Sequence, residues 1–366
     1  MKSRIVFVTN DETYGGPNKV CERVFNLLKE SQPTELIVQG EGNPGFKDLS
    51  KTQYRQFTRA NFKFITQFIK EERKYFDHSI YIAFGTKQSL LLCFLKIVLG
   101  KKIKLIVRTG LNKEGSNRKK GNFFKDYVQL HICKVLYNLS DSLVTETKSM
   151  QEWWVSEGVD QQKVTHINNP VKKLEINNEG LSFYNKVTKG FTKVIVSVGR
   201  LSYQKDHELL ILSFNDYLTK KRDSNDLLII LGEGDELNRL KKITSDLGIS
   251  NKVLFLGYVS NVRPFLEMSD LYCLTSRWEG GVNSLIEAVY YGSKILSIDC
   301  PVGPKDILNG ISGARLVPNR SPVEFSNAMF DILNDEATSE VKRKINTYSD
   351  AYIRAEYHRV ISEAKK

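Results

Sequence analysis

The sequence lacks several features that would place the protein in other classes. It has only five cysteines in 366 residues, and no two of them form a C-x-x-C pair. Isolated cysteines are typical of small buried side chains in a reducing compartment, so we expect neither a disulfide framework nor a cysteine metal site. The five histidines are scattered without the spacing of metal ligands, and no metal or cofactor is expected.

Long apolar runs are also missing. The most apolar segment, Ser89–Leu99, is interrupted by Lys96 and falls well short of the ~20 residues that cross a bilayer. We expect it to form a buried helix. The opening MKSRIVFVTN is a short β-rich run without the long apolar core of a signal peptide. These features predict a cytoplasmic protein that is either soluble or peripheral on the inner face of the cell membrane.

Negative charge is comparatively scarce. The chain carries 54 lysines and arginines against 42 acidic residues, a net charge of +12, and 41% of its residues are apolar. The length and apolar content suit two folded domains and exclude a disordered chain. A basic surplus fits three kinds of partner: nucleic acid, an anionic membrane, or a negatively charged small substrate. Composition alone does not choose among them.

The positive charge is concentrated in the first half. Residues 1–170 hold 27 basic and 17 acidic residues, a net charge of +10, whereas residues 171–366 have a net charge of +2. The densest basic runs are Lys101, Lys102 and Lys104, and then Arg118–Lys120, which is followed by Phe123–Phe124. Such runs are either a solvated loop and helix face or a docking surface for phosphates and lipid head groups.

The first half alternates between apolar strands and helices. This alternation predicts βαβ units and a parallel sheet, with ligands at the carboxyl ends of the strands. The expected strands are Arg4–Thr9, Glu35–Gln39, Ser79–Phe84, Ile103–Val107, Ser142–Thr145 and Val164–Ile167. The expected helices are Pro17–Glu30, Phe62–Phe76, Gln88–Leu99 and Phe123–Leu139.

A second series of the same kind follows a polar stretch. We expect a first domain over 1–170, a linker over 171–190, a second domain over 191–345, and a C-terminal helix over 346–366 that could brace both domains. Two doubly wound α/β domains in tandem predict a ligand cleft between them. The second set of strands is Lys193–Val198, Leu227–Leu231, Val253–Leu256, Asp270–Leu274, Lys294–Ile298 and Ala314–Val317.

The stretch Trp278–Ala288 carries two glutamates eight residues apart. Gly280 and Gly281 follow a predicted strand and precede a helical pattern, so backbone N–H groups at a helix N-terminus can approach a ligand closely. Such an end attracts phosphate, and carboxylates beside it accept hydrogen bonds from sugar hydroxyls. Taken alone, the stretch fits a capped surface helix with incidental acids equally well.

A second motif favours the ligand site. Ser197–Leu201 ends a predicted strand and contains Arg200, and Lys205 lies five residues further on. A guanidinium and an ammonium at the carboxyl end of a strand neutralise a diphosphate without a metal. The alternative is a salt-bridged surface pair.

Together these stretches resemble the retaining glycosyltransferases of family 4, which have the two-domain GT-B fold. The resemblance runs from Ser197 to Leu308 and includes SVGRL, LLIILGEGDELNRL, VLFLGYVSNV, SDLYCLTSRWEGGVNSLIEA and DCPVGPKDIL. In the first half it is limited to the opening strand, the Gly15–Gly16 loop and the junction Asn169–Val171.

The resemblance implies roles for individual residues. Arg200 and Lys205 match the ligands of the donor diphosphate, Glu279 matches a residue beside the donor sugar, and Glu287 matches one that binds the ribose. The other implied donor-binding positions are Gly15, Gly16, Gly232, Gly234, Tyr258, Val259, Gly280, Gly281 and Val282. Many relatives carry a histidine where this chain reads Val107–Gly110, and Arg108 there either contacts sugar or phosphate or is an ordinary rim residue.

The resemblance therefore implies a metal-independent retaining hexosyltransferase of bacterial surface polysaccharide biosynthesis. It would use a UDP-hexose or UDP-N-acetylhexosamine, with GDP not excluded, and a glycan or lipid-linked acceptor. The basic first domain would face an anionic membrane surface. The alternatives are a dinucleotide-dependent oxidoreductase, which lacks a G-x-G-x-x-G after the first strand, and a nucleic-acid-binding protein, which lacks a recognition motif.

Overall fold

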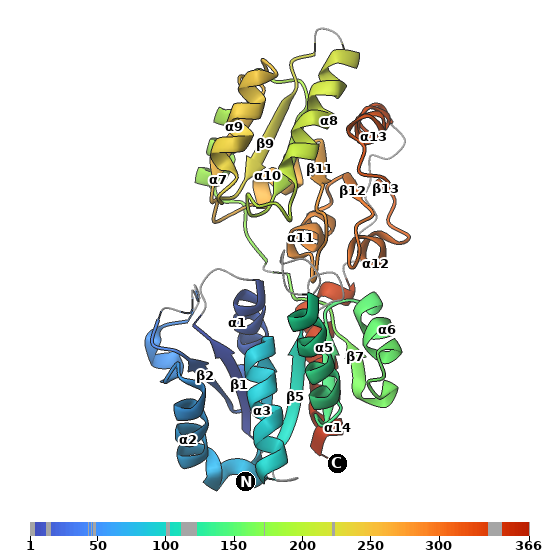
Figure 1. Ribbon diagram of the computed structural model, residues 1–366. Helices are drawn as coiled ribbons and strands as arrows, with labels where there is room; N and C mark the ends of the chain where they lie inside the picture. The colour runs from blue at the N-terminus through green and yellow to red at the C-terminus, as the bar shows by residue number, and fades with distance from the viewer. Residues whose placement is uncertain are drawn as a thin grey trace. The chain divides into compact units, whose positions relative to one another are not determined.

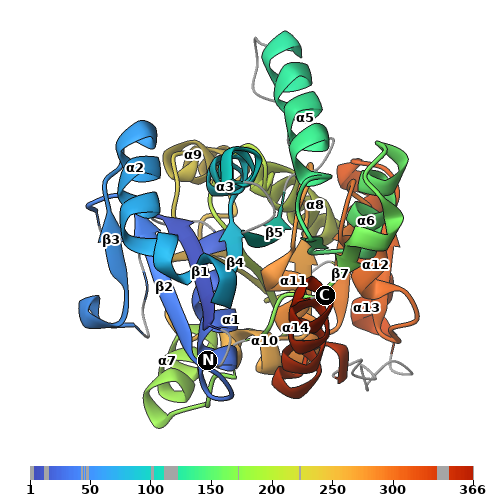
Figure 2. The same cartoon turned by 90° about the horizontal axis from the view of Figure 1, so that it is seen from below.

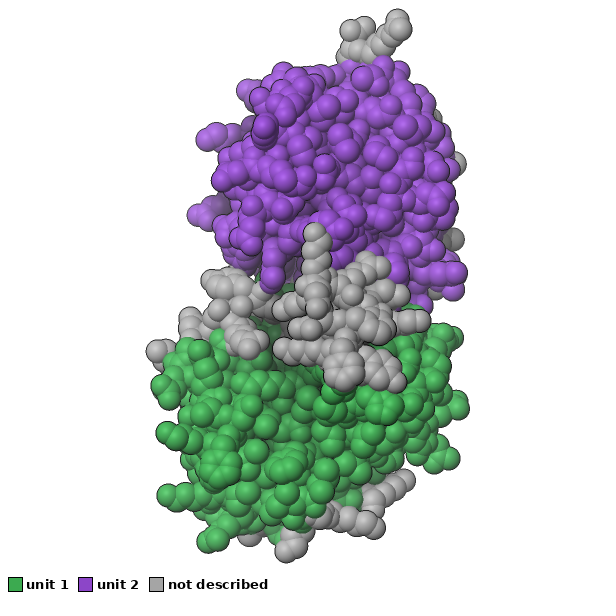
Figure 3. All heavy atoms as spheres, in the orientation of Figure 1, with its two compact units in different colours: residues 1–170, 347–366 green, residues 171–346 purple. Residues whose placement is uncertain are grey.

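The computed structural model describes residues 4–11, 16–42, 44, 46, 49–99, 103–110, 123–171, 173–221, 224–335 and 346–365. The chain divides into two compact units (Figures 1 and 3). The first consists of residues 1–170 and 347–366, and the second of residues 171–346.

The first unit is built on a seven-stranded parallel sheet with the order β3-β2-β1-β4-β5-β6-β7. β1 pairs in parallel with β2 on one side and with β4 on the other. All six residues of β4 are buried, as expected for a parallel strand covered on both faces. The strands are β1 (Arg4–Asn10), β2 (Thr34–Gln39), β3 (Arg55–Phe57), β4 (Ser79–Phe84), β5 (Lys104–Thr109), β6 (Ser142–Thr145) and β7 (Val164–His166).

Helices cover both faces of this sheet (Figure 2). One face packs against α1 (Gly16–Lys29) and α14 (Asp350–Lys365). The other packs against α2 (Asn61–Glu72), α3 (Thr86–Leu99), α5 (Phe123–Tyr137) and α6 (Lys148–Ser156). Short 3-10 turns complete the unit: η1 (Lys51–Gln53), η2 (Arg73–His78), η4 (Gln161–Lys163) and η6 (Asn346–Tyr348). The C-terminal helix, which we predicted as a brace, therefore packs on the first sheet.

The second unit repeats the plan with a six-stranded parallel sheet of order β10-β9-β8-β11-β12-β13. Its strands are β8 (Val194–Val198), β9 (Leu227–Leu231), β10 (Val253–Gly257), β11 (Leu271–Leu274), β12 (Ile295–Ile298) and β13 (Ala314–Val317). Its helices are α7 (Asn178–Thr188), α8 (His207–Lys220), α9 (Leu237–Asp246), α10 (Arg263–Met268), α11 (Asn283–Tyr291), α12 (Pro304–Leu308) and α13 (Pro322–Asn334).

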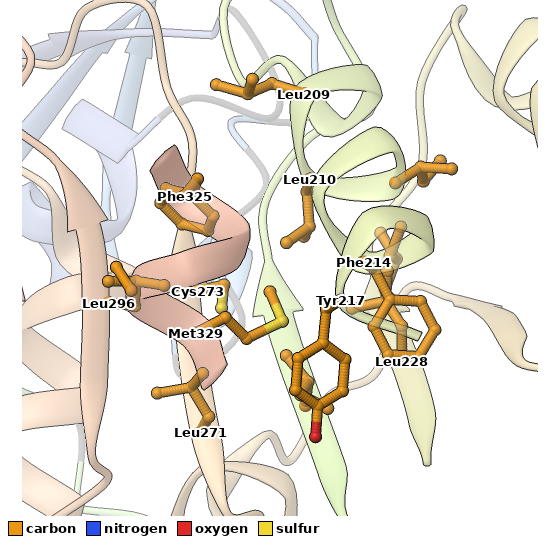
Figure 4. Close-up of a cluster of buried hydrophobic side chains, with 14 of the residues drawn as sticks. Leu209, Leu210, Phe214, Tyr217, Leu228, Leu271, Cys273, Leu296, Phe325 and Met329 are labelled. Atoms are coloured by element: carbon orange, nitrogen blue, oxygen red, sulfur yellow. The ribbon is translucent and has the colours of Figure 1, made fainter. Parts of the chain in front are cut away.

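The core of the second unit lies between the sheet and helices α8, α9 and α13. Figure 4 shows Phe214 and Tyr217 of α8 on one side of this cluster and Met329 of α13 beside Cys273 of β11. Because these side chains hold α8 firmly against the sheet, the loop between β8 and α8 has two fixed ends.

The predicted doubly wound α/β class is confirmed. The structure adds β3, a three-residue strand too short to carry an alternating pattern. It also adds α7 within the segment predicted as a linker. Tyr184 of that helix is buried, and its hydroxyl donates to the Met268 carbonyl at 3.0 Å. The apolar residues of α7 are few, and only Tyr184 among them is buried, so they left little pattern to detect.

The prediction that Ser89–Leu99 forms a buried helix is right about the helix and wrong about its burial. Leu92, Cys93 and Leu95 of α3 face the core, but Phe94, Ile97 and Val98 are at least half exposed. Within the described residues, no helix combines the length and the apolar composition needed to cross a bilayer.

Candidate functional site

The predicted cations of the second unit lie at the carboxyl edge of its sheet. β8 ends at Val198 and is followed by Gly199 and Arg200, and Arg200 is exposed. Lys205 stands in the turn before α8. Because β11 is the immediate parallel neighbour of β8, the loops that follow these two strands meet at this edge.

Lys205 and Glu279 come together across these two loops. The Lys205 Nζ lies 2.5 Å from the Glu279 Oε1, and the Ser276 hydroxyl donates to the same oxygen. Only 5% of the Glu279 side chain and 18% of the Lys205 side chain are exposed. A carboxylate this deeply buried requires such partners, since an unpaired buried charge is costly. The pair therefore holds the ammonium group in a defined position at the edge of the sheet.

A second ion-pair cluster fixes the loop that carries Lys205. Asp206 adopts a left-handed conformation, with φ of 47°, and its carboxylate pairs with Arg277 at 2.8 Å and with Arg320. The Thr275 hydroxyl donates to the Asp206 carbonyl at 3.0 Å. Sequence reasoning missed these residues, because Asp206 and Arg320 are 114 positions apart and form no local motif.

Aromatic side chains border the same edge. Tyr203 is 63% exposed, and the Arg277 guanidinium lies over its ring at 4.2 Å from the centroid. The Trp278 ring lies 6.1 Å from the Tyr203 ring. The Gln204 amide donates to the Trp278 carbonyl at 2.9 Å, which joins the two loops. This arrangement was also not predicted from the sequence.

The glycine-rich stretch leads into α11 as predicted from the pattern. Gly280 and Gly281 precede Val282, the residue before the helix, and Val282 is 1% exposed. The Asn283 amide donates to the Gly281 carbonyl at 2.8 Å, which forms a tight turn at the helix start. The partial positive charge at the N-terminus of a helix makes this end favourable for an anion. Glu287 is half-buried on α11 itself.

The loops after β9 and β10 lie close to the loop after β8. A Cβ atom at Gly232, where φ is 140°, would lie 1.9 Å from the Gly199 carbonyl oxygen. At Gly234 it would lie 2.1 Å from the Leu201 carbonyl oxygen. Two backbone hydrogen bonds, from Leu201 to Glu233 at 2.9 Å and from Gly232 to Gly257 at 2.7 Å, join the three loops. Only glycine permits this approach at both positions.

Tyr258 and Val259 belong to the same loop cluster. The Tyr258 amide donates to the Glu233 carboxylate at 3.4 Å, and the Tyr258 ring is 46% exposed. Val259 is partly buried. Apart from Glu287, which is in the middle of α11, every predicted donor-site residue of the second unit thus lies in a loop or helix start that follows β8, β9, β10 or β11.

The predicted residues of the first unit have different surroundings. Gly16 is the first residue of α1, while Gly15 lies outside the described residues, as do the basic residues Lys101, Lys102 and Arg118–Lys120. The described part of the chain contains no cluster of three or more histidine, cysteine or acidic side chains with metal-binding geometry.

Arg108 corrects the sequence prediction. It is 2% exposed, so it is not a rim residue. Its guanidinium donates to the Tyr357 hydroxyl of α14 at 2.7 Å, to the Asn169 side chain and to the Ile167 carbonyl at 3.4 Å. These donors join α14, β5 and the chain segment that leaves the first unit. These contacts give Arg108 a role in the packing of the first unit, while a contact with sugar or phosphate stays a prediction.

All five cysteines are free and buried, as the spacing predicted. Burial raises the pKa of each thiol, to about 12 for Cys93 and Cys300 and to about 11 for Cys133. At neutral pH these groups are therefore protonated small hydrophobic side chains.

Several curated relatives match all or part of the chain, and three of them bear on its function. An uncharacterized glycosyltransferase of Haemophilus influenzae is 27% identical over 360 residues, which are 96% of each protein. The uncharacterized glycosyltransferase MJ1059 of Methanocaldococcus jannaschii is 31% identical over 180 residues, which are 48% of this chain and 44% of that relative.

The third relative has an assigned reaction. The N-acetylgalactosamine-N,N'-diacetylbacillosaminyl-diphospho-undecaprenol 4-alpha-N-acetylgalactosaminyltransferase of Campylobacter jejuni is 27% identical over 242 residues. The match covers 63% of this chain and 61% of the Campylobacter protein. For two of the three relatives, the chain thus matches less than two thirds of their length.

A solved structure is similar over the whole chain. The crystal structure of Anabaena Alr3699/HepE in complex with UDP superimposes with a TM-score of 0.78 at 16% sequence identity, covering 99% of this chain and 100% of that one. At this identity the likeness establishes the fold, which is GT-B.

The family comparison converges on the same part of the chain as the geometry. Residues 184–350 match the family described as glycosyl transferases group 1. This range contains strands β8 to β13 and the Lys205–Glu279 pair. The second unit therefore matches the glycosyl transferases group 1 family, in agreement with the resemblance to glycosyltransferase family 4, and the chain has the GT-B fold.

Proposed function

We propose that this glycosyltransferase moves a hexose or N-acetylhexosamine from a UDP donor to a glycan or lipid-linked acceptor of a bacterial surface polysaccharide. The observation that carries the proposal is the Lys205–Glu279 pair at the carboxyl edge of the second sheet, with Arg200 exposed beside it in the chain. Fixed cations at such an edge suit a diphosphate. The complex of Alr3699/HepE with UDP supports uridine as the nucleoside.

Arg200 and Lys205 would stabilise the charge that grows on the leaving diphosphate as the sugar bond breaks. The arginine binds through its planar fork, and the lysine acts as a point charge. Lys205 is held by Glu279 before the donor arrives, so little reorganisation is needed. No metal is required in this scheme, because two cations meet the diphosphate.

The remaining donor contacts follow from the loops. Glu279 would lie by the donor sugar and Glu287 would accept hydrogen bonds from the ribose hydroxyls. The amides of Gly281 and Val282 would face the sugar and phosphates, beside Gly280. Gly232, Gly234, Tyr258 and Val259 would form the walls of the base pocket. Gly15 and Gly16 of the first unit would let the backbone approach the diphosphate and the acceptor.

The transfer would retain the anomeric configuration, as members of family 4 do. In the scheme we favour, the acceptor hydroxyl attacks the anomeric carbon from the face that the diphosphate leaves. The C–O bond to the diphosphate breaks, and the departing phosphate oxygen takes the acceptor proton. Positioning and electrostatic stabilisation then supply most of the catalysis, and no protein nucleophile is needed.

The acceptor and the location are proposed from charge and relatives. The Campylobacter relative is named for an undecaprenol-diphosphate acceptor. The net charge of +10 on residues 1–170 supports a first unit that faces an anionic membrane or a phosphate-bearing lipid acceptor, on the cytoplasmic side. The family match sets aside the oxidoreductase and the nucleic-acid-binding alternatives.

Nucleotide binding tests the donor site directly. Thermal unfolding is measured with UDP, GDP, ADP and their sugars, and a ligand at 100 times its Kd adds about 2.7 kcal/mol of stability. We expect UDP and a UDP-sugar to raise the Tm most. No stabilisation by any nucleotide would refute the proposed donor site, and a preference for GDP would change the base.

The variant Arg200→Ala tests whether the Arg200 guanidinium stabilises the leaving diphosphate. Loss of one such donor is expected to lower kcat about 100-fold to 1000-fold, or about 2.7–4 kcal/mol of barrier, with the fold intact. Arg315→Ala is the matched control, because Arg315 is an arginine of the same unit paired with Asp331 at the surface. Turnover of Arg200→Ala within a few-fold of the parent would remove Arg200 from the mechanism.

A further inference from the structure

Two neighbouring helices of the first unit expose large apolar side chains on their outer sides. We call this surface the α3–α5 face. On α3, Phe94, Ile97 and Val98 are 50%, 56% and 59% exposed. The helices α3 and α5 pack side by side, and Figure 2 shows α5 standing out from the layer formed by α2 and α3. The remaining members come from α5 and the turn after it: Val128, Ile132, Val135 and Leu139.

The spacing shows that these residues form continuous stripes. Phe94, Ile97 and Val98 follow an i, i+3, i+4 pattern, and Val128, Ile132 and Val135 follow i, i+4, i+7. The opposite sides of both helices, including Leu95 and Cys133, are buried in the core. A helix that is apolar on both sides normally has both sides covered. The inner side is covered by the sheet, so the outer stripe requires another apolar medium.

The charge around the face favours an anionic surface. Among the side chains described on α3 and on α5 from Val128 onward there is no carboxylate, whereas Lys87, Lys96 and Lys134 are present. The carboxylate that follows α5, Asp141, is paired with Lys96. A second copy of the chain would bring two first halves of net charge +10 together, which like-charge repulsion opposes.

We propose that the α3–α5 face inserts into the interfacial region of an anionic bilayer and holds the first unit there. This inference rests on the proposed membrane location and names the surface that produces it. The apolar stripes would enter the boundary between head groups and acyl chains, and Lys87 and Lys134 would meet the anionic head groups, whereas Lys96 is held by Asp141. Apolar burial makes part of the binding insensitive to salt, which distinguishes insertion from purely electrostatic docking.

Co-sedimentation of the full chain with vesicles tests the proposal. Vesicles of phosphatidylethanolamine and phosphatidylglycerol are compared with vesicles of phosphatidylcholine. We expect the parent to bind the anionic vesicles and to remain partly bound at high salt. The double variant Ile97→Glu, Val135→Glu is expected to lower the partition coefficient about tenfold or more, because it places two carboxylates in the apolar stripes.

A charge-matched control separates the face from net charge. Phe62 on α2 is 78% exposed and Val323 on α13 is 53% exposed, and neither belongs to the face. Phe62→Glu, Val323→Glu should keep more than half of the parent's binding. Equal loss in both double variants, or parent binding fully reversed by salt, would overturn the insertion. A parent dimer that only the Ile97→Glu, Val135→Glu variant dissociates would assign the face to a second copy instead.

Two further measurements complete the test. Ile97→Glu, Val135→Glu should keep the Tm increase with UDP, so that a failed donor site is distinguished from a failed membrane face. Phe94→Trp, a conservative change at an exposed position, should shift its emission to shorter wavelength and be quenched by brominated lipids in anionic vesicles. An emission spectrum that vesicles leave unchanged would place residue 94 outside the bilayer and contradict the proposal.

Discussion

Each sheet of this protein presents an arginine near its carboxyl edge, and the two arginines have opposite surroundings. Arg200, after β8, is exposed, whereas Arg108, in β5, is 2% exposed. Arg108 donates to Tyr357 and Asn169 and so contributes to the packing of the first unit. In the second unit, Lys205 lies near the edge and pairs with Glu279. The Tyr203 ring and the Arg277 guanidinium above it lie at the same edge.

The difference shows that position at the carboxyl edge of a parallel sheet does not by itself leave a side chain accessible. What matters is whether neighbouring segments of the chain take up the polar groups of the side chain. In the first unit the returning helix α14 brings Tyr357 to Arg108. In the second unit, the loops after β8 and β11 hold Lys205 at the edge with 18% of its side chain still exposed.

The comparison predicts that Arg108→Ala destabilises the protein much more than Arg200→Ala does. Removing the buried guanidinium takes a donor from Tyr357, Asn169 and Ile167, and each buried polar group left without a partner costs about 1–3 kcal/mol. We expect a loss of about 3 kcal/mol for Arg108→Ala and less than about 0.5 kcal/mol for Arg200→Ala. Urea unfolding of both variants measures the difference.

Arg108→Lys is the matched control for this prediction. Lysine keeps the charge but lacks the planar fork that reaches two partners at once, so an intermediate loss is expected. A destabilisation by Arg108→Ala no larger than that by Arg200→Ala would contradict the structural role of Arg108.

Corresponding glycines sharpen the comparison. Gly40 follows β2 and Gly232 follows β9, and both strands lie beside the first strand of their sheet. A Cβ atom at Gly232 would meet the Gly199 carbonyl at 1.9 Å, whereas at Gly40 it would meet the Asp11 side chain, with Cγ at 2.0 Å. Gly40→Ala and Gly232→Ala are each expected to lower the free energy of unfolding by about 2–3 kcal/mol, because the backbone at each position also has a positive φ.

The two substitutions should differ in whether a second substitution restores the lost stability. Asp11→Ala removes the atoms that obstruct Gly40→Ala, so a double-mutant cycle should give a favourable coupling of about 1 kcal/mol. No side-chain deletion relieves Gly232→Ala, because its obstacle is backbone. Urea unfolding of the single and double variants measures the coupling. A coupling near zero at Gly40 would mean that φ alone causes the cost.

Much of the fold could be predicted from the sequence, because its strands are short apolar runs separated by polar turns. β4, β6, β9 and β13 were predicted with the bounds that the structure has. The residues of the Lys205–Glu279 pair were predicted from their motifs. Their direct contact was not, because 74 positions separate them and only the pairing of β8 with β11 brings them together.

Two other expectations were corrected for a related reason. A rim position was one of two alternatives for Arg108, but Arg108 is buried, and its partner Tyr357 is 249 positions away on α14. The apolar sequence of α3 predicted burial, yet sequence does not specify which neighbours cover a helix, and the outer side of α3 is exposed. Tertiary neighbours decided both cases.

The smallest predicted effect concerns the two histidines that the units place in different environments. His207, at the start of α8, is 3% exposed, and in the described structure its Nδ1 has no hydrogen-bond partner. Burial, together with the Lys205 charge, lowers its pKa from 6.5 to about 3. The pKa of His358 on α14 is also lowered, mainly by burial, but its ring lies within hydrogen-bond distance of Ser31, at 3.0 Å.

The sign of the pH effect follows from proton binding. Between the folded and unfolded pKa values of His207, the unfolded chain binds the proton and the folded one does not, so stability falls as the pH is lowered. Protonation of His207 in the unfolded chain should lower the free energy of unfolding by about 1 kcal/mol from about pH 6.5 to about pH 5.5.

His207→Phe should flatten the dependence of the urea midpoint on pH over this range, and His358→Gln should change this dependence less. If His207→Phe leaves the slope unchanged, the imidazole is not held neutral by its surroundings. If the slope flattens, Lys205→Ala should raise the pKa of His207 and narrow the pH range of the effect, because it removes a positive charge that opposes protonation of the imidazole.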